Sequence, residues 1–176
     1  MSIAAVVLAA GEATRFGSPK QRLFLPQVLE RLSMAPIDEV AVVQGAYELE
    51  VPSDTVSQGI PVRLAACPHW RRGPGASLRC GLDALSNDVE AAVVVLADGP
   101  DLSPDAVARL VGVWKESSGI VAASYAGARG HPLVIGRGDW DAVPDEGLRE
   151  LAVRLVPCDD LGSPRDIDTP EDLRES

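Results

Sequence analysis

Length, composition and charge limit the class of protein before any motif is considered. The chain has 176 residues, of which 46% are hydrophobic and 24% charged, which suits one globular domain and excludes a disordered or fibrous chain. Its net charge of −10 argues against nucleic acid as a partner. A metal ion can still bridge acidic side chains to a small anionic substrate.

Two continuous apolar runs indicate strands that are buried on both faces. Residues 3–9 form the first run. No positive charge precedes it and it stops at Gly11, so we expect a strand there and not a signal peptide. Residues 91–97 form the second run, which is far too short to cross a bilayer. The sequence therefore predicts no membrane partner.

Strand and helix patterns alternate along the rest of the chain. Ser103, Pro104 and Asp105 combine the residue types that favour a helix start, and Thr169-Pro170 repeats this signal before a terminal helix. Such alternation is typical of a parallel sheet with helices on both faces. We therefore predict an α/β fold, a single-domain three-layer α/β/α sandwich with a mostly parallel sheet, over residues 1–176. The predicted strands cover 3–9, 40–44, 62–66, 91–97 and 120–125, and the predicted helices cover 76–85 and 104–116, with Trp114 in the core.

The three cysteines, Cys67, Cys80 and Cys158, are far apart in the sequence and form no C-x-x-C pair. An odd, scattered set predicts free thiols in a reducing compartment. Together with the missing signal peptide and membrane span, this pattern leads us to expect a cytoplasmic protein. Only two histidines accompany the cysteines, so the sequence offers no zinc site.

The segment after the first strand has the composition of a phosphate-binding loop. Ala9, Ala10 and Gly11 let the backbone approach a ligand closely, and backbone N–H groups can cradle phosphate oxygens. Arg15 and Lys20 add two cations. The segment is neither a Walker loop nor a dinucleotide fingerprint, because the lysine and glycine spacings differ. The glycines alone suit a generic turn, whereas the two cations favour a phosphate site.

Carboxylates in two other parts of the chain, after residues 91–97 and before the predicted terminal helix, are candidates for a Mg²⁺ site. Asp98 follows the strand at 91–97, where a carboxylate can bind the Mg²⁺ of a nucleotide. The tetrapeptide from Asp98 to Asp101 is also typical of a turn, and that alternative stays open. Asp166 and Asp168 would point to the same side of an extended segment, although Asp168 equally suits a cap before the last helix.

Residues 69–72 have the sequence His-Trp-Arg-Arg, which mixes an aromatic ring with basic side chains. Loops that bind nucleic acids have such mixtures. On a chain this acidic, one short patch is more simply a solvated loop or a contact for an acceptor phosphate.

Taken together, these segments resemble the molybdenum cofactor cytidylyltransferase family, whose fold is similar to that of nucleotide-diphospho-sugar transferases. The match runs in order along almost the whole chain. It rests on Leu8-Ala9-Ala10-Gly11 with Arg15, Gly17 and Lys20; on Gly73, Ser77-Leu78 and Gly81; on Asp98 and Pro100; on Gly130-His131-Pro132; on Asp145, Gly147 and Arg149; and on residues 166–173.

The resemblance implies a Mg²⁺-dependent nucleotidyltransferase that transfers CMP from CTP to a phosphorylated acceptor and releases pyrophosphate. The L-A-A-G form of the first motif goes with CTP over GTP. The implied acceptor is a molybdopterin-type cofactor, and a molybdoenzyme is implied as a partner. The acceptor phosphate attacks the α-phosphorus in line, so the protein mainly positions the reactants and neutralises charge.

The resemblance also assigns roles to residues. Lys20, Arg15 and Asp98 are the expected catalytic residues, since the two cations would bind the β- and γ-phosphates and Asp98 would bind Mg²⁺. Asp166 is the expected second metal ligand, and Asp168 is the reserve. The remaining roles are nucleotide binding by Leu8, Ala9, Ala10, Gly11 and Ser77, and acceptor binding by His131 and Asp145.

Two departures from the family pattern affect the substrate. The G-x-P-L turn that usually follows the lysine is missing, so residues 20–28 run almost directly into a short helix, and Cys67 stands where relatives often have asparagine. These departures keep a second function open, that of a non-catalytic chaperone that binds a nucleotide or the molybdenum cofactor. A third alternative is a relative of the same fold that bears an oxidoreductase name, although the chain has no complete dinucleotide fingerprint or flavin motif.

Overall fold

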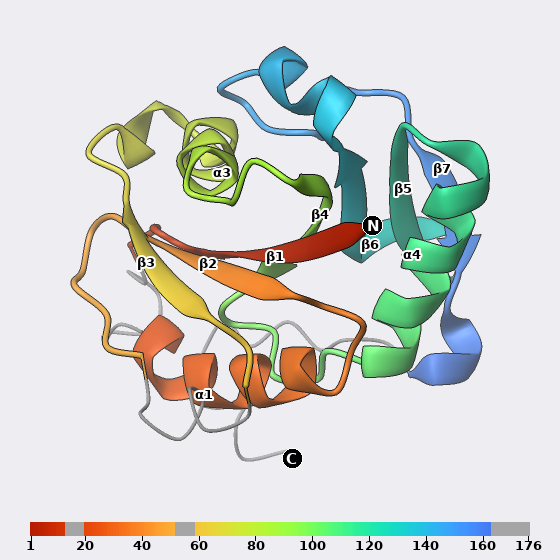
Figure 1. Cartoon of the computed structure of the whole chain (residues 1–176), viewed down its shortest axis with the longest axis horizontal. Coiled ribbons are helices and arrows are strands. Elements are labelled where there is room, and N and C mark those ends of the chain that lie inside the picture. Colours follow the sequence, from red (N-terminus) through yellow and green to blue (C-terminus); the bar gives the residue numbers. More distant parts are fainter. Residues whose placement is uncertain (13–19, 52–58, 163–176) are drawn as a thin grey trace.

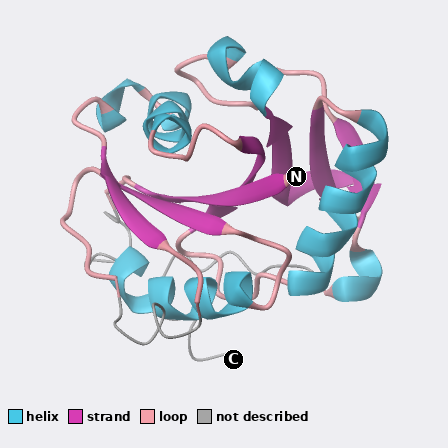
Figure 2. Ribbon diagram, viewed as in Figure 1, coloured by secondary structure: helices cyan, strands magenta, loops and turns pink. Residues whose placement is uncertain are grey.

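The computed structural model describes residues 1–12, 20–51 and 59–162, with only the backbone of Lys20. In this part of the chain a twisted seven-stranded sheet forms the middle layer, in the order β3-β2-β1-β4-β6-β5-β7, and helices cover both faces (Figures 1 and 2). The strands are β1 (Ser2–Ala9), β2 (Glu39–Gln44), β3 (Val62–Ala66), β4 (Val89–Leu96), β5 (Ile120–Tyr125), β6 (Ala128–Gly136) and β7 (Arg154–Pro157). The helices are α1 (Lys20–Ser33), α3 (Pro74–Asp83) and α4 (Pro104–Ser117), with short 3₁₀ turns η1 (Trp70–Arg72), η2 (Arg137–Ala142) and η3 (Asp159–Leu161).

Most neighbouring strands are parallel, as the sequence predicts. β1 pairs in parallel with β2 and β4, β2 with β3, and β5 with β7, whereas β6 runs antiparallel to β4 and β5. All five predicted strands are present. β6 and β7 escaped prediction because their local signals are weak: the first half of β6 contains Arg129, His131 and Pro132, and β7 has only 4 residues and is mostly exposed.

Aliphatic side chains fill the core on both faces of the sheet. On one face α1 and α4 pack Leu25 and Leu110 against the strands, and on the other α3 packs Leu78 and Leu82. Trp114 is buried on α4, as predicted. None of the helices in the described ranges is long and apolar enough to span a membrane.

The helix signals in the sequence are confirmed with small shifts. The Ala106 N–H donates to Ser103 Oγ at 3.2 Å, which caps the start of α4. α3 begins at Pro74, two residues before the predicted start. The short helix expected after Lys20 is wrong in length, because α1 begins at Lys20 itself and has 14 residues. The terminal helix predicted at Thr169 lies outside the described residues.

The prediction of free thiols is wrong for two of the three cysteines. Cys67, just after β3, and Cys80, on α3, form a disulfide with their Cα atoms 5.7 Å apart. Spacing in the sequence does not reveal this pair, because only the fold brings α3 beside the end of β3. Cys158 is free and buried, and burial raises the pKa of its thiol. The cysteines therefore do not indicate a reducing compartment.

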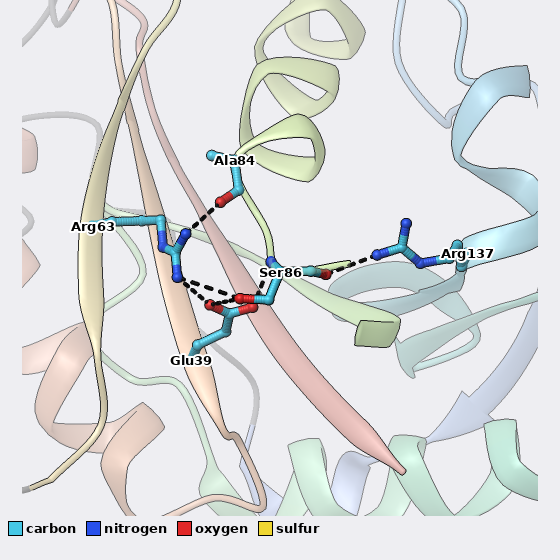
Figure 3. A network of polar contacts seen from close by, with 5 residues as sticks. All are labelled: Glu39, Arg63, Ala84, Ser86 and Arg137. Carbon is cyan, nitrogen blue, oxygen red and sulfur yellow. Dashed lines mark hydrogen bonds and ion pairs between the residues drawn. The ribbon is translucent and has the colours of Figure 1, made fainter. Parts of the chain in front are cut away.

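A polar network joins the amino ends of the parallel strands (Figure 3). Glu39, the first residue of β2, is buried, and its carboxylate accepts hydrogen bonds from Arg63 Nη2 on β3 at 2.6 Å and from the Ser86 N–H at 2.8 Å. Arg63 also donates to the Ala84 carbonyl at 3.0 Å, and Arg137 donates to the Ser86 carbonyl at 2.8 Å. One carboxylate thereby links β2, β3 and the segment before β4.

Replacing Glu39 tests this link. Glu39→Gln keeps the shape of the side chain but gives up one acceptor oxygen and the charge, so a donor from Arg63 or Ser86 loses its partner. We expect the free energy of unfolding to fall by about 1–3 kcal/mol in urea titrations. Glu90→Gln, at an exposed position on β4, is the matched control and should leave the midpoint nearly unchanged. Equal midpoints for both variants would contradict the role of the network.

The disulfide makes a separate prediction. Cys67 and Cys80 are 13 residues apart, and a bridge closing a loop of about this length stabilises a domain by about 3 kcal/mol. A reductant should therefore lower the melting temperature of the wild type but not that of Cys80→Ala. A thiol titration of the unfolded chain should find one thiol without reductant, from Cys158, and all three after reduction. Three thiols in both titrations would show that the bridge does not form.

Candidate functional site

A cavity of about 870 Å³ opens at the carboxyl-terminal edge of the sheet. Its walls come from the segments that follow β1, β3 and β4 and from the first turns of α1 and α3. Open α/β sheets bind their ligands at this edge. A second cavity, of about 560 Å³, lies at the opposite edge beside Trp114 and Arg137 and contains none of the predicted site residues.

The fold brings predicted residues from three separate segments into the first cavity. Leu8, Ala10 and Gly11 line it from the end of β1, Ser77 lines it from α3, and Asp98 lines it from the segment after β4. These segments are distant in the sequence and meet because β1 lies beside β4 and α3 packs on β1 and β2.

Several predicted residues are not placed at the cavity. Ala9 is buried in β1 and does not line it. Arg15, Asp166 and Asp168 lie outside the described residues, as does the side chain of Lys20. Their expected roles in binding phosphates and metal therefore stay predictions.

The two expected acceptor residues do not line the cavity either. His131 lies on β6, and its carbonyl accepts a hydrogen bond from the Tyr125 hydroxyl at 3.1 Å. Asp145 accepts hydrogen bonds from Arg72 and Arg79. The hydrogen bond from Arg79 lowers the pKa of the Asp145 carboxyl below its ordinary value. Asp145 is therefore an anion at neutral pH, paired with arginines on η1 and α3.

The segment around Asp145 fixes the start of α3. The Gly75 N–H donates to the Asp145 carbonyl at 2.9 Å. Gly73 has a φ of 139°, and a Cβ there would collide with the same carbonyl, while a Cβ at Gly75 would collide with the carbonyl of Pro144. Only glycine allows this approach. The contact sets the position of the first turn of α3, from which Ser77 lines the cavity.

Gln21 is a cavity residue that the sequence analysis missed. Its Nε2 donates to the Gly11 carbonyl at 2.9 Å, which ties the first turn of α1 to the glycine segment. The side chain is buried, and its Oε1 has no hydrogen-bond partner within the described ranges. A neutral side chain next to a lysine gave no signal, because its role depends on α1 reaching back to the end of β1.

Trp70 and Arg71 also line the cavity, whereas their sequence favours a solvated loop or a contact for an acceptor phosphate. Arg71 Cζ lies 5.0 Å from the centroid of the Trp70 ring, and Arg71 Nη2 lies 3.1 Å from Glu12 Oε1. These side chains reach the site because η1 follows β3 at the edge where ligands bind. Because they follow a predicted strand, their place in the sequence is itself the signal for a position at this edge.

Asp98 is suited to hold a metal ion. It lines the cavity, is partly exposed, and follows the central strand β4. Among the residues that the structure describes, no three His, Cys, Asp or Glu side chains cluster as a metal site. Mg²⁺ next to a nucleotide needs only one or two carboxylates, because phosphate oxygens and water complete its shell. Asp98 fits that requirement.

Comparisons with known sequences place the chain in a family. Residues 5–155 match the MobA-like NTP transferase domain. The purine catabolism protein PucB of Bacillus subtilis is 30% identical over 95% of this chain and 92% of that protein. The probable molybdenum cofactor guanylyltransferase of Rhodopirellula baltica is 32% identical over 64% of this chain and 56% of that protein. The bifunctional protein GlmU of Sorangium cellulosum is 31% identical over 62% of this chain, which spans only 26% of the length of GlmU.

Solved structures share the fold of this chain. Rv0371c from Mycobacterium tuberculosis has a TM-score of 0.79 at 26% identity, covering 99% of this chain and 97% of that one, and its complex with manganese has a TM-score of 0.72 at 25% identity over the same shares. A nucleotidyl transferase from Methanothermobacter shares the fold with a TM-score of 0.71 at 23% identity, covering 99% and 95% of the two chains. The fold is that of the nucleotide-diphospho-sugar transferases, as expected. The chain belongs to the MobA-like NTP transferase domain family and is a nucleotidyltransferase.

Proposed function

We propose that this nucleotidyltransferase transfers CMP from CTP to a phosphorylated, molybdopterin-type acceptor and releases pyrophosphate. One observation carries the proposal: the segments after β1 and β4 and the start of α3 line a single cavity at the ligand-binding edge of the sheet. A substrate rich in phosphate groups needs small residues, whose backbone N–H groups are accessible to phosphate oxygens, and a carboxylate to bind the metal ion. This cavity provides both.

The reaction forms a bond between an acceptor phosphate oxygen and the α-phosphorus of CTP and breaks the bond to the β-phosphate. Negative charge grows on the pyrophosphate as it leaves, so the proposed roles of Arg15 and Lys20 are to bind the β- and γ-phosphates. Asp98 would hold Mg²⁺ together with Asp166 or Asp168. The ion supplies charge neutralisation when bound, while the glycine segment and Ser77 orient the nucleoside.

The choice of CTP over GTP rests on the first motif. Ala10 lines the cavity, and its methyl group takes up space that glycine would leave to a larger base. The Rhodopirellula relative is named a guanylyltransferase and PucB is named for purine catabolism, so the relatives do not decide the base.

The acceptor proposal draws on the name of the Rhodopirellula relative, which refers to the molybdenum cofactor. The product, a molybdopterin-type cofactor joined to CMP, would pass to a molybdoenzyme partner. His131 keeps its proposed contact with the acceptor, whereas the two arginine contacts of Asp145 make it a positioning residue for the start of α3. We propose that residues 1–176 form one domain that works in the cytoplasm, where nucleoside triphosphates are available, even though disulfides persist better in oxidising compartments.

Asp98 provides the first test. With CTP, Mg²⁺ and molybdopterin, the wild type should release pyrophosphate, and Asp98→Asn should lower kcat/KM by at least about 100-fold, because the metal ion that neutralises the triphosphate loses an anionic ligand. Asp88→Asn, exposed before β4, is the control and should keep wild-type activity. Binding of CTP by the wild type without pyrophosphate release would instead support the non-catalytic chaperone.

Ala10 provides the second test. Ala10→Gly removes one methyl group from the cavity wall and should raise the ratio of kcat/KM for GTP to that for CTP by about tenfold. Ala66→Gly makes the same change at an exposed position at the end of β3 and should leave the ratio unchanged. Competition assays with both nucleotides present measure the ratio directly. An unchanged ratio in Ala10→Gly would mean that the base is selected elsewhere.

A further inference from the structure

We propose that Trp70 is the platform on which the nucleobase stacks and that Arg71 covers this platform until a nucleotide binds. The inference rests on the proposed function, since it concerns the same cavity and names the residue that receives the base. It assigns the aromatic and basic segment after β3 to the base, and not to an acceptor phosphate or to solvent.

The position of Trp70 fits one end of a nucleotide. Among the described residues that line the cavity, it is the aromatic one. Its turn, η1, packs beside α3 after β3 (Figure 1), whereas Asp98 follows β4. β2 and β1 lie between β3 and β4, so these segments leave the sheet three strand spacings apart, roughly 14 Å. A triphosphate tail near Asp98 therefore leaves the base on the Trp70 side.

The Trp70 ring is held in place before any ligand arrives. It packs against Gly45, where a Cβ would lie only 2.6 Å from Trp70 Cγ and 2.8 Å from the Ala10 carbonyl oxygen. That carbonyl accepts a hydrogen bond from the Ala46 N–H at 3.0 Å, and the Trp70 N–H donates to the Cys67 carbonyl at 3.3 Å. A ring fixed in this way gives a stacking surface whose ordering costs little when the nucleotide binds.

Arg71 covers the ring through contacts that are easily exchanged. Its guanidinium lies 5.0 Å from the ring centroid and pairs with Glu12, and the two side chains are 78% and 42% exposed. Exposed cation–π contacts and surface ion pairs are weak, whereas stacking of a base on an aromatic ring contributes more. A base can therefore take the place of the guanidinium on the ring.

Binding titrations with ligands that contain or lack a nucleobase test whether the base stacks on Trp70. CTP, GTP and inorganic tripolyphosphate, each with Mg²⁺, are titrated calorimetrically into the wild type, Trp70→Leu and Trp70→Phe. We expect Trp70→Leu to weaken CTP and GTP by about 10- to 100-fold and to leave tripolyphosphate unchanged, and Trp70→Phe to restore most of the nucleotide affinity. Equal CTP affinity in the wild type and Trp70→Leu overturns the proposal. A parallel loss for tripolyphosphate also overturns it, because the ring would then only support the site.

Tryptophan fluorescence supplies a second test, which does not require Trp70→Leu to fold correctly. Trp114 and Trp140 are each only 8% exposed, so a stacked base should quench chiefly Trp70. CTP should quench the emission of the wild type and of Trp140→Phe but not that of Trp70→Phe, although Trp70→Phe still binds CTP. Quenching that persists in Trp70→Phe overturns the platform while leaving the proposed function intact. A wild type that binds none of the three probes overturns both.

Discussion

The parallel register of β1 with its neighbours is the constraint on which the rest of the structure depends. Ala9 pairs with Gln44 on β2, Leu8 pairs with Leu96 on β4, and Gln44 pairs with Ala66 on β3. Since these four strands run the same way, they end at one edge, and the segments after β1, β3 and β4 supply walls of the cavity. A slip of one residue would exchange the side chains that pack against the two helical layers and disrupt both cores, so the fold and the site share one register.

Small residues then decide how closely the segments approach. Gly45 admits the Trp70 ring, and Gly73 and Gly75 admit the backbone around Asp145. At each position a single methyl group would collide with its neighbour. These three glycines are thus packing requirements of the site, and the side chains that line the cavity are positioned by backbone contacts that contain no catalytic group.

The sequence predicts the parts of this structure that local patterns control. Strands buried on both faces appear as apolar runs, and a rule about strand ends places Gly11 and Asp98 at the cavity. Gln21 could not be found in this way, because its hydrogen bond crosses from α1 to the end of β1. The Cys67–Cys80 disulfide escaped for the same reason, since its partners meet only after α3 packs beside β3.

The arginines beside the cavity are already paired with carboxylates of the fold. Arg72 and Arg79 both bind the Asp145 carboxylate, and Arg71 pairs with Glu12. These three arginines already pair with two carboxylates of the fold, and Arg72 and Arg79 share Asp145 at the start of α3. A triphosphate brings several negative charges to a chain whose own net charge is −10, so further cations are required. We propose that Arg15, between β1 and α1, and Lys20, the first residue of α1, supply them.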